Sequence, residues 1–253
     1  MPPATATIQL AENEIHVWTL NPKLIIENET LRALLSSAER EKVDRYRLAS
    51  SQHTALITRA FIRLLLSQYA PSPPQTWQFT VGKMGKPEIE HNRLGLRFNL
   101  SHNDELIVCA ICLNNDIGCD IENLSRKISV NAIAKRFFSE QEAQRIKADP
   151  TRFFEYWTLK EAFVKATGLG ISQGLETFSF QINDSKRKKI NDNIELTFNK
   201  GCKQASPQNW YQALLFPDDK HCIGLSYHNQ KQVDVKPNTH LFSVEQSAAL
   251  FNV

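Results

Sequence analysis

Two short segments carry the residues of this sequence that are best suited to chemistry. Asp120 and Glu122 are separated by one residue in a strand-like segment, so their carboxylates lie on one face, about 6.6 Å apart. Glu161 and Lys165 lie one turn apart in a helix-like segment. Carboxylate oxygens are the ligands that Mg²⁺ prefers, and Mg²⁺ usually completes its shell with water and phosphate oxygens. Three carboxylates beside a lysine therefore predict a divalent cation and a phosphate-bearing ligand.

A purely structural interpretation of these residues is also open. The chain has 27 acidic residues among 253, and chance alone gives roughly three acidic pairs separated by one residue. Glu161 and Lys165 could form a surface ion pair that contributes about 0.3–0.5 kcal/mol. The choice between these interpretations depends on the rest of the chain.

Composition places the chain among globular proteins of one large domain or two small ones. It is 42% hydrophobic and 23% charged, with a net charge of +3. This charge does not require nucleic acid as a partner, but it suits an acidic protein or a phosphorylated ligand. The sequence starts without a basic segment followed by an apolar one, and no apolar run approaches the roughly 20 residues of a membrane span. We therefore expect a cytoplasmic protein with no membrane partner.

The five cysteines have no spacing typical of a disulfide framework. Cys109 and Cys112 have the spacing of a metal or redox motif, but they lie within the apolar, strand-like segment 105–113. Because cysteine is among the most often buried residues, a role in the core is favoured. Reduced thiols also agree with a cytoplasmic location.

The hydrophobic pattern divides the chain into two halves of similar composition. In the first half, strands are expected at 14–20, 77–81, 96–100 and 105–113, with helical pattern from 28 to 69. In the second half, strands are expected at 117–122, 177–182, 194–198, 210–216 and 222–227, with helices at 129–137, 139–147 and 151–168. This order predicts an α+β protein of two similar lobes, a pseudo-dimer formed by residues 1–115 and 116–253. Each lobe would be an antiparallel sheet packed with helices, and the active site would lie in the cleft between them.

Four motifs follow one another along the chain: Gly85-Lys86-Pro87, Asn99-Leu100-Ser101-His102, Gly118-Cys119-Asp120-Ile121-Glu122, and Trp157-x-x-Lys160-Glu161-x-x-x-Lys165. In kind, order and spacing they resemble the 4′-phosphopantetheinyl transferase superfamily, specifically its Sfp-like branch, in which one chain holds two lobes. The resemblance runs from about Arg40 to Gly174. It implies an enzyme that moves the 4′-phosphopantetheine group of coenzyme A onto a serine of an apo acyl or peptidyl carrier protein. The product that leaves would be 3′,5′-ADP.

The resemblance also implies roles for the residues of the two opening segments. Asp120, Glu122 and Glu161 would hold Mg²⁺, or Mn²⁺ in its place, and Asp120 would thereby face the bound coenzyme A. Glu161 is also the candidate general base, directly or through a metal-bound water. Lys165 would contact the pyrophosphate. Lys160 either supports that contact or is a solvated helix residue.

A second group of residues would bind coenzyme A. His102 matches the family position that contacts the 3′-phosphate, and Ser101 either lines the same pocket or caps the following turn. Lys86 and Pro87 resemble the loop that lies along the nucleotide. Lys42 matches a basic position that reaches the phosphates.

The chain departs from the family pattern at Thr54, where a basic residue usually lies near the 3′-phosphate. His53, Arg59 or Arg63 could compensate for this difference. Arg63 is also interpretable as a structural residue of the helix end.

Carrier proteins of this family are typically acidic helical bundles. Residues 123–139 alternate basic and apolar side chains, as a docking surface for such a bundle would require. We hypothesise that Arg126 and Lys127 touch the carrier, although the segment is also compatible with an ordinary amphipathic helix. The two-lobed length predicts a monomer, because the second lobe would do what a partner subunit does in shorter relatives.

Two competing functions remain open at this point. One is a coenzyme A or carrier-binding module without turnover, which the presence of all three carboxylates and Lys165 disfavours. The other is a different Mg²⁺-dependent phosphoryl-transfer enzyme, such as a nuclease or phosphohydrolase. The modest charge and the absence of a basic stripe interleaved with aromatic residues disfavour a nucleic-acid substrate.

Overall fold

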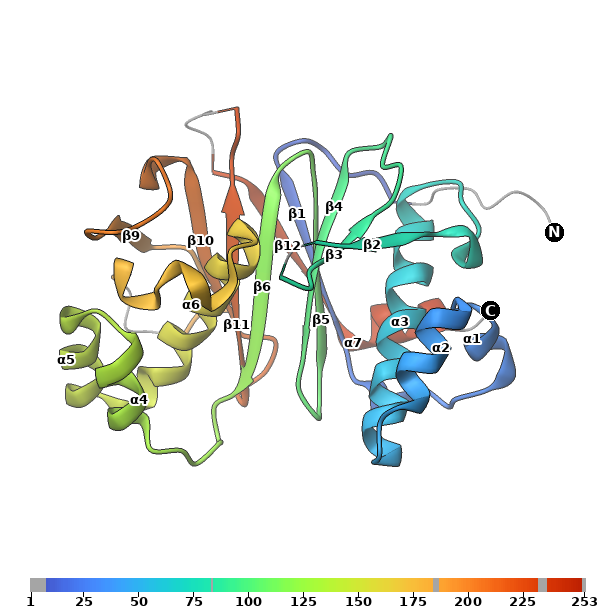
Figure 1. Ribbon diagram of the computed structural model, residues 1–253, viewed down its shortest axis with the longest axis horizontal. Coiled ribbons are helices and arrows are strands. Elements are labelled where there is room, and N and C mark those ends of the chain that lie inside the picture. Colours follow the sequence, from blue (N-terminus) through green and yellow to red (C-terminus); the bar gives the residue numbers. More distant parts are fainter. Residues whose placement is uncertain (1–7, 83, 184–186, 232–235, 252–253) are drawn as a thin grey trace.

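Two four-stranded sheets pack against each other at the centre of the molecule, and helices cover the outer side of each sheet (Figure 1). The computed structural model describes residues 8–82, 84–183, 187–231 and 236–251. Two smaller two-stranded sheets, β2 with β3 and β7 with β9, complete the fold. The predicted α+β class is confirmed.

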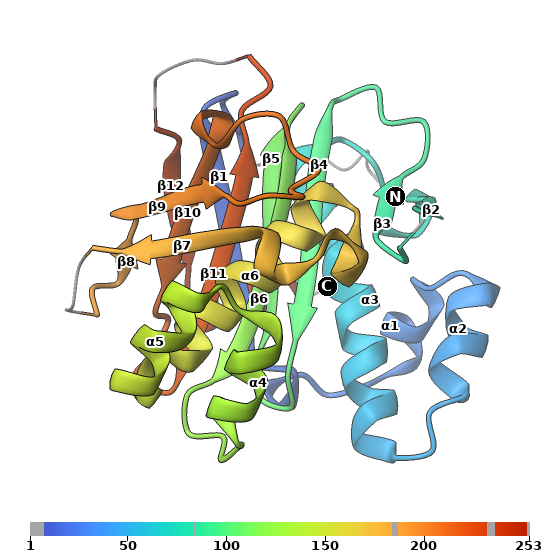
Figure 2. The ribbon, with the colours of Figure 1, turned by 60° about the vertical axis from the view of Figure 1, so that its left-hand side comes forward.

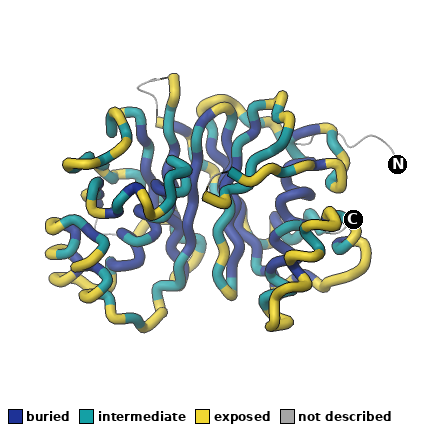
Figure 3. Tube along the Cα trace, viewed as in Figure 1, coloured by how far each residue is buried: buried dark blue, intermediate teal, exposed yellow. Residues whose placement is uncertain are grey.

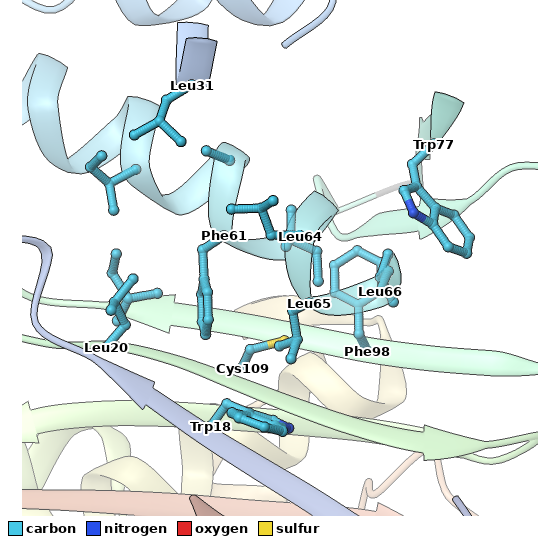
Figure 4. Close-up of a cluster of buried hydrophobic side chains, with 14 of the residues drawn as sticks. Trp18, Leu20, Leu31, Phe61, Leu64, Leu65, Leu66, Trp77, Phe98 and Cys109 are labelled. Carbon is cyan, nitrogen blue, oxygen red and sulfur yellow. The ribbon is translucent and has the colours of Figure 1, made fainter. Parts of the chain in front are cut away.

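The first sheet has the strand order β12-β1-β5-β4, with β1 parallel to β12 and the other pairs antiparallel. Its strands are β1 (Glu14–Leu20), β4 (Leu96–His102), β5 (Ile107–Leu113) and β12 (Asn238–Phe242). The helices on its outer side are α1 (Glu29–Ala33), α2 (Ser37–Asp44), α3 (Ala49–Tyr69) and α7 (Val244–Ala248), and the hairpin β2 (Phe79–Val81) and β3 (Pro87–Ile89) lies next to β4. Figure 4 shows the apolar core that forms where α3 packs onto this sheet.

The second sheet has the order β6-β11-β10-β8 and is antiparallel throughout. Its strands are β6 (Asp116–Asn123), β8 (Ile190–Asn191), β10 (Trp210–Leu215) and β11 (His221–His228). Its outer side carries α6 (Phe153–Thr167), with α4 (Val130–Phe137), α5 (Glu140–Ala148), β7 (Phe178–Ile182) and β9 (Ile194–Phe198) around it (Figure 2). Strands β4 and β6 lie side by side, so the two sheets meet along these strands.

The strand β5 is apolar at every position because both of its faces are buried. Cys109 packs in the core beneath α3, whereas Cys112 packs in the core between the sheets. An odd spacing puts two strand residues on opposite faces, so these cysteines cannot act as a pair. Both thiols are free and buried, and the predicted core role is confirmed. Figure 3 shows how burial concentrates in the sheets and the inner helix faces.

The last described residues, 238–251, pack with the first sheet. Strand β12 pairs with β1, and the ring of Phe242 stacks on Trp18 with centroids 3.8 Å apart. Phe251 packs beside Phe61 of α3. The division near residue 115 stays a prediction. Within the described ranges, no helix has the length and apolar character needed to cross a membrane.

Candidate active site

Helix α6 lies unusually close to the second sheet because two glycines leave room for its backbone. A Cβ on Gly118 of β6 would lie 2.0 Å from the carbonyl oxygen of Ala162, and one on Gly224 of β11 would lie 2.3 Å from the backbone of Thr158. Such distances are incompatible with any side chain. The two glycines therefore bring the α6 residues Glu161 and Lys165 directly over β6.

The alternation of β6 separates its apolar residues from its acidic ones. Ile117, Cys119 and Ile121 are buried in the core between the sheets. Asp120 and Glu122 have the opposite parity, so their carboxylates lie on the face that α6 covers. The strand thus presents both acids to the helix.

Lys165 connects α6 to both sheets. Its Nζ donates hydrogen bonds to Asp120 Oδ1 at 2.6 Å, to Ser101 Oγ at 3.0 Å and to the carbonyl oxygen of Cys119 at 3.2 Å. Ser101 Oγ, from β4, also donates to Asp120 Oδ1 at 2.8 Å. Burial alone would lower the pKa of Lys165, but Asp120, Cys119 and Glu161 together raise it above its usual value. Lys165 is therefore a fixed cation where β4, β6 and α6 meet.

Glu161 has an unsatisfied carboxylate in the same region. Its Oε1 is buried and finds no hydrogen-bond partner among the residues that the structure describes. Burial, followed by the charges of Asp120 and then Glu122, raises the pKa of Glu161 despite the opposing effect of Lys165. A buried acceptor without a partner is costly, and perturbed carboxylates of this kind are typical of functional sites.

Glu122 has a cation of its own. Arg126 Nη1 donates to Glu122 Oε2 at 2.6 Å. Burial nevertheless raises the pKa of Glu122, because it outweighs the attraction of Arg126. Lys165 thus pairs with Asp120, and Arg126 pairs with Glu122. Among the described residues, no basic side chain forms an ion pair with Glu161.

The donor chemistry of these three carboxylates fits a hard divalent cation. Among the residues that the structure describes, no group of three or more His, Cys, Asp or Glu side chains is gathered closely enough to be a ready-made metal site. Instead, Lys165 forms an ion pair with Asp120, and Arg126 forms one with Glu122. A cation would supply the partner that Glu161 Oε1 lacks, provided that the two basic side chains release their carboxylates.

A cavity of about 710 Å³ lies on the side of the first sheet, between α2, α3, the β2–β3 hairpin and β4. Lys42, Pro87 and His102 line it, as does Arg59. Burial, then Lys165, then Arg59 lower the pKa of His102. Because His102 directly follows Ser101 on β4, the cavity and the Lys165 cluster are neighbours.

The side chain of Lys86 bonds to the second sheet, and its predicted place along the nucleotide stays a prediction. Its Nζ donates to the carbonyl oxygen of Ile117 on β6 at 2.8 Å, and burial lowers its pKa. The ammonium thus ties the β2–β3 loop to the second sheet, while the adjacent Pro87 lines the cavity. Position 83 of the predicted turn 82–87 lies outside the described residues.

Lys160 lies in the core and not beside Lys165. It is fully buried and pairs with Glu142 at 2.8 Å, and its Nζ also donates to the carbonyl oxygens of Leu175 and Phe178. Five residues rotate a helix position by about 140°, so Lys160 points away from the side that carries Lys165. Lys160 is therefore not a solvated helix residue, and its support of the pyrophosphate contact stays a prediction.

Arg59, one of the three residues that could compensate for Thr54, lines the cavity. The guanidinium of Arg63 is engaged by Glu39 at 2.6 Å, which confirms its structural interpretation, and His53 bonds the carbonyl oxygen of Pro22. Arg59 donates to the carbonyl oxygen of Ala55, and no carboxylate in the described part of the chain forms an ion pair with it. Among the three residues that could compensate for Thr54, Arg59 therefore has the most available charge.

The predicted carrier contacts lie on the turn between β6 and α4. Arg126 and Lys127 are both exposed. Ile133 and Phe137 of α4 pack partly into the second core, as in an ordinary amphipathic helix. The docking of a carrier at this turn stays a prediction.

The chain resembles known proteins over most of its length. Residues 116–225 match the family model of the 4′-phosphopantetheinyl transferase superfamily, and residues 25–114 match that of the N-terminal part of 4′-phosphopantetheinyl transferases. The chain is 30% identical to the 4′-phosphopantetheinyl transferase HetI of Nostoc sp. over 87% of its own length and 90% of the relative's. It is 31% identical to the 4′-phosphopantetheinyl transferase Sfp of Bacillus subtilis, over 65% and 74% of the two chains, and 28% identical to a phosphopantetheinyl transferase of Thraustochytrium sp., over 82% and 75%. The chain therefore belongs to the 4′-phosphopantetheinyl transferase superfamily and is an enzyme of that class.

Proposed function

We propose that this protein transfers the 4′-phosphopantetheine group of coenzyme A to a serine of an apo carrier protein, releases 3′,5′-ADP and uses Mg²⁺. One observation carries the proposal: a cavity with basic side chains and a carboxylate–lysine cluster adjoin at His102 and Ser101 of β4. A substrate with a phosphorylated nucleotide at one end and a reacting pyrophosphate next to it suits this adjacency.

The cavity supplies the features that the nucleotide end would need. A volume of about 710 Å³ is in the range of pockets for ligands of this size. Lys42, Arg59 and His102 would face the phosphates, since ammonium, guanidinium and imidazolium groups all donate to phosphate oxygens. Pro87 adds an apolar wall without competing donors.

The carboxylate–lysine cluster supplies the groups for the transfer step. The serine oxygen of the carrier forms a bond to the phosphorus nearer the pantetheine, and the bond from that phosphorus to the bridging oxygen breaks. The serine proton goes to Glu161, whose raised pKa makes it a stronger base than an ordinary carboxylate. The electron pair leaves with 3′,5′-ADP, and the Lys165 ammonium compensates for the negative charge that builds up there.

Asp120, Glu122 and Glu161 are the residues that would hold Mg²⁺, and the unpartnered Oε1 of Glu161 supports this. A bound Mg²⁺ would neutralise charge on the pyrophosphate oxygens. Arg126 and Lys127 would meet the acidic surface of the carrier. The monomeric state and the cytoplasmic location stay predictions.

Intact-protein mass spectrometry tests the reaction. A purified apo acyl carrier protein, incubated with the protein, coenzyme A and Mg²⁺, should gain about 340 Da, the mass of a phosphopantetheine group on a serine hydroxyl. The gain should vanish with EDTA and with Glu161→Ala. It should persist with Glu140→Ala, which removes an exposed helix carboxylate on α5 instead. Coenzyme A binding without any gain on several acidic carriers would contradict the proposal and favour a binding module.

A further inference from the structure

Arg126 holds Glu122 and is also open to solvent. On one side its guanidinium bonds Glu122 at 2.6 Å, and its Cζ lies 5.7 Å from the centre of the Phe154 ring. On the other side it faces solvent, since 55% of its side chain is exposed, against 14% for Glu122. Arg126 is thus a bridge between a half-buried carboxylate and the outer surface.

The neighbouring Lys127 does not connect the carboxylates to the surface in this way. It is exposed on the same turn, and within the described residues it forms no ion pair with a carboxylate. The two basic residues therefore offer similar charge to an approaching acidic surface, but only Arg126 also holds a residue of the carboxylate cluster.

We propose that Arg126 exchanges Glu122 for an acidic group of the carrier protein, so that carrier docking and divalent-cation binding at the carboxylate cluster strengthen each other. This inference rests on the proposed function, because it requires both an acidic carrier and a cation held by Glu122.

The physical basis is competition for one carboxylate. While Arg126 pairs with Glu122, a cation must displace a guanidinium at 2.6 Å and also approach a positive charge. An acidic carrier that draws Arg126 outward removes both obstacles. By thermodynamic linkage, a cation on Glu122 must release Arg126 for the carrier by the same factor. The two binding events are therefore coupled without any change of fold.

The test measures the binding of Mn²⁺ rather than turnover. Mn²⁺ is titrated without coenzyme A and followed by the electron paramagnetic resonance signal of the free ion. The titration is repeated with a saturating apo acyl carrier protein whose acceptor serine is replaced by alanine, after its unsubstituted form has been shown to be modified. For the unsubstituted enzyme we expect the carrier to tighten Mn²⁺ binding by about fivefold, the low end of typical coupling factors because the pair is partly exposed.

Two variants distinguish the proposed coupling through Arg126 from a general effect of positive charge on carrier binding. Arg126→Met should bind Mn²⁺ more tightly without carrier, and the carrier should then add less than about twofold. Lys127→Met should need more carrier for saturation, yet keep the full tightening of Mn²⁺ binding once saturated. Circular dichroism should show both variants folded, because both side chains are exposed.

The outcomes distinguish a failure of this proposal from a failure of the proposed function on which it rests. If the enzyme modifies the carrier but Mn²⁺ affinity does not respond to it, or if Arg126→Met responds as fully as the unsubstituted enzyme, the exchange of Arg126 is wrong and the transfer stands. If no acidic carrier is modified and Mn²⁺ does not bind, the proposed function fails and the coupling fails with it.

Discussion

At the scale of single residues, Glu161 combines a cost to stability with the catalytic role proposed for it. Its pKa is raised in the fold, so above its ordinary value the ionised carboxylate destabilises the native state, and below that value the cost is absent. We predict that Glu161→Gln melts at a higher temperature than the unsubstituted protein at pH 7 in EDTA. This difference should shrink as the pH falls toward 4. Transfer should drop by at least about a hundredfold, as expected for the loss of a general base. Thermal unfolding and mass spectrometry check the two effects, and a lower melting temperature at pH 7 would contradict the argument.

The lowered pKa of His102 predicts that the enzyme takes up a proton when coenzyme A binds. Burial, Lys165 and Arg59 lower its pKa below the usual 6.5, so the free enzyme holds it neutral at pH 7. A phosphate beside the ring favours the imidazolium and raises that pKa. Coenzyme A binding near pH 6.5 should therefore take up a proton at His102. Calorimetry in buffers of different ionisation heat measures this uptake. The uptake should decrease in His102→Gln and persist in Lys42→Met, and an equal uptake in both variants would assign the proton elsewhere.

The sequence identified the residues with catalytic chemistry better than it identified their partners. Asp120, Glu161 and Lys165 could be found because strand and helix periods put them on known faces. The burial of Lys160 could not, because its partners Glu142, Leu175 and Phe178 lie on elements whose packing no local pattern specifies.

At the scale of elements, the approach of α6 to the second sheet depends on Gly118. A methyl group there would lie 2.0 Å from the Ala162 carbonyl oxygen, which belongs to the backbone and cannot rotate away. We predict that Gly118→Ala destabilises the protein by about 1–3 kcal/mol, as other overpacking substitutions do. Because α6 carries Glu161 and Lys165, transfer should fall further than the loss of folded protein explains. Urea unfolding and transfer rates per folded molecule measure this. Gly82→Ala is the matched control, since its Cβ would lie 3.4 Å from the nearest atom, and an equally stable Gly118→Ala would refute the role.

Most elements could be predicted, and the exceptions share a physical cause. The predicted strands 14–20 and 194–198 have the observed bounds, and the three helices of the second half begin and end within two residues of the predicted positions. The strand Asn238–Phe242 and the helix after it were missed. Its five residues lack clear alternation, and its partner β1 lies more than 200 residues away in the chain. Short strands stabilised by distant partners leave little local signal.

At the scale of the whole molecule, the site exists because two sheets and their helices are held in one arrangement. Ser101 comes from the first sheet, Asp120 from the second and Lys165 from α6, and one hydrogen-bonded cluster unites them. The end of the chain contributes at a distance, since β12 extends the first sheet and Phe251 packs beside α3. The first sheet, which carries Ser101 and His102, therefore packs with segments from near both ends of the chain.

The contribution of each core to the site can be measured by substituting one aromatic residue in each. Phe242 stacks on Trp18 of the first sheet. The ring centroid of Phe198 on β9 lies 5.9 Å from the ring centroid of Phe163 on α6. Both rings are partly buried, so each change to alanine should cost about 2 kcal/mol, less than the removal of a fully buried ring. In hydrogen exchange, Phe242→Ala should reduce protection in β1 and α3, and Phe198→Ala should reduce it around α6. Coenzyme A binding should then weaken mainly in Phe242→Ala, because α3 carries the cavity residue Arg59. If Phe242→Ala instead reduced protection around α6 alone, the end of the chain would support the second sheet and not the first.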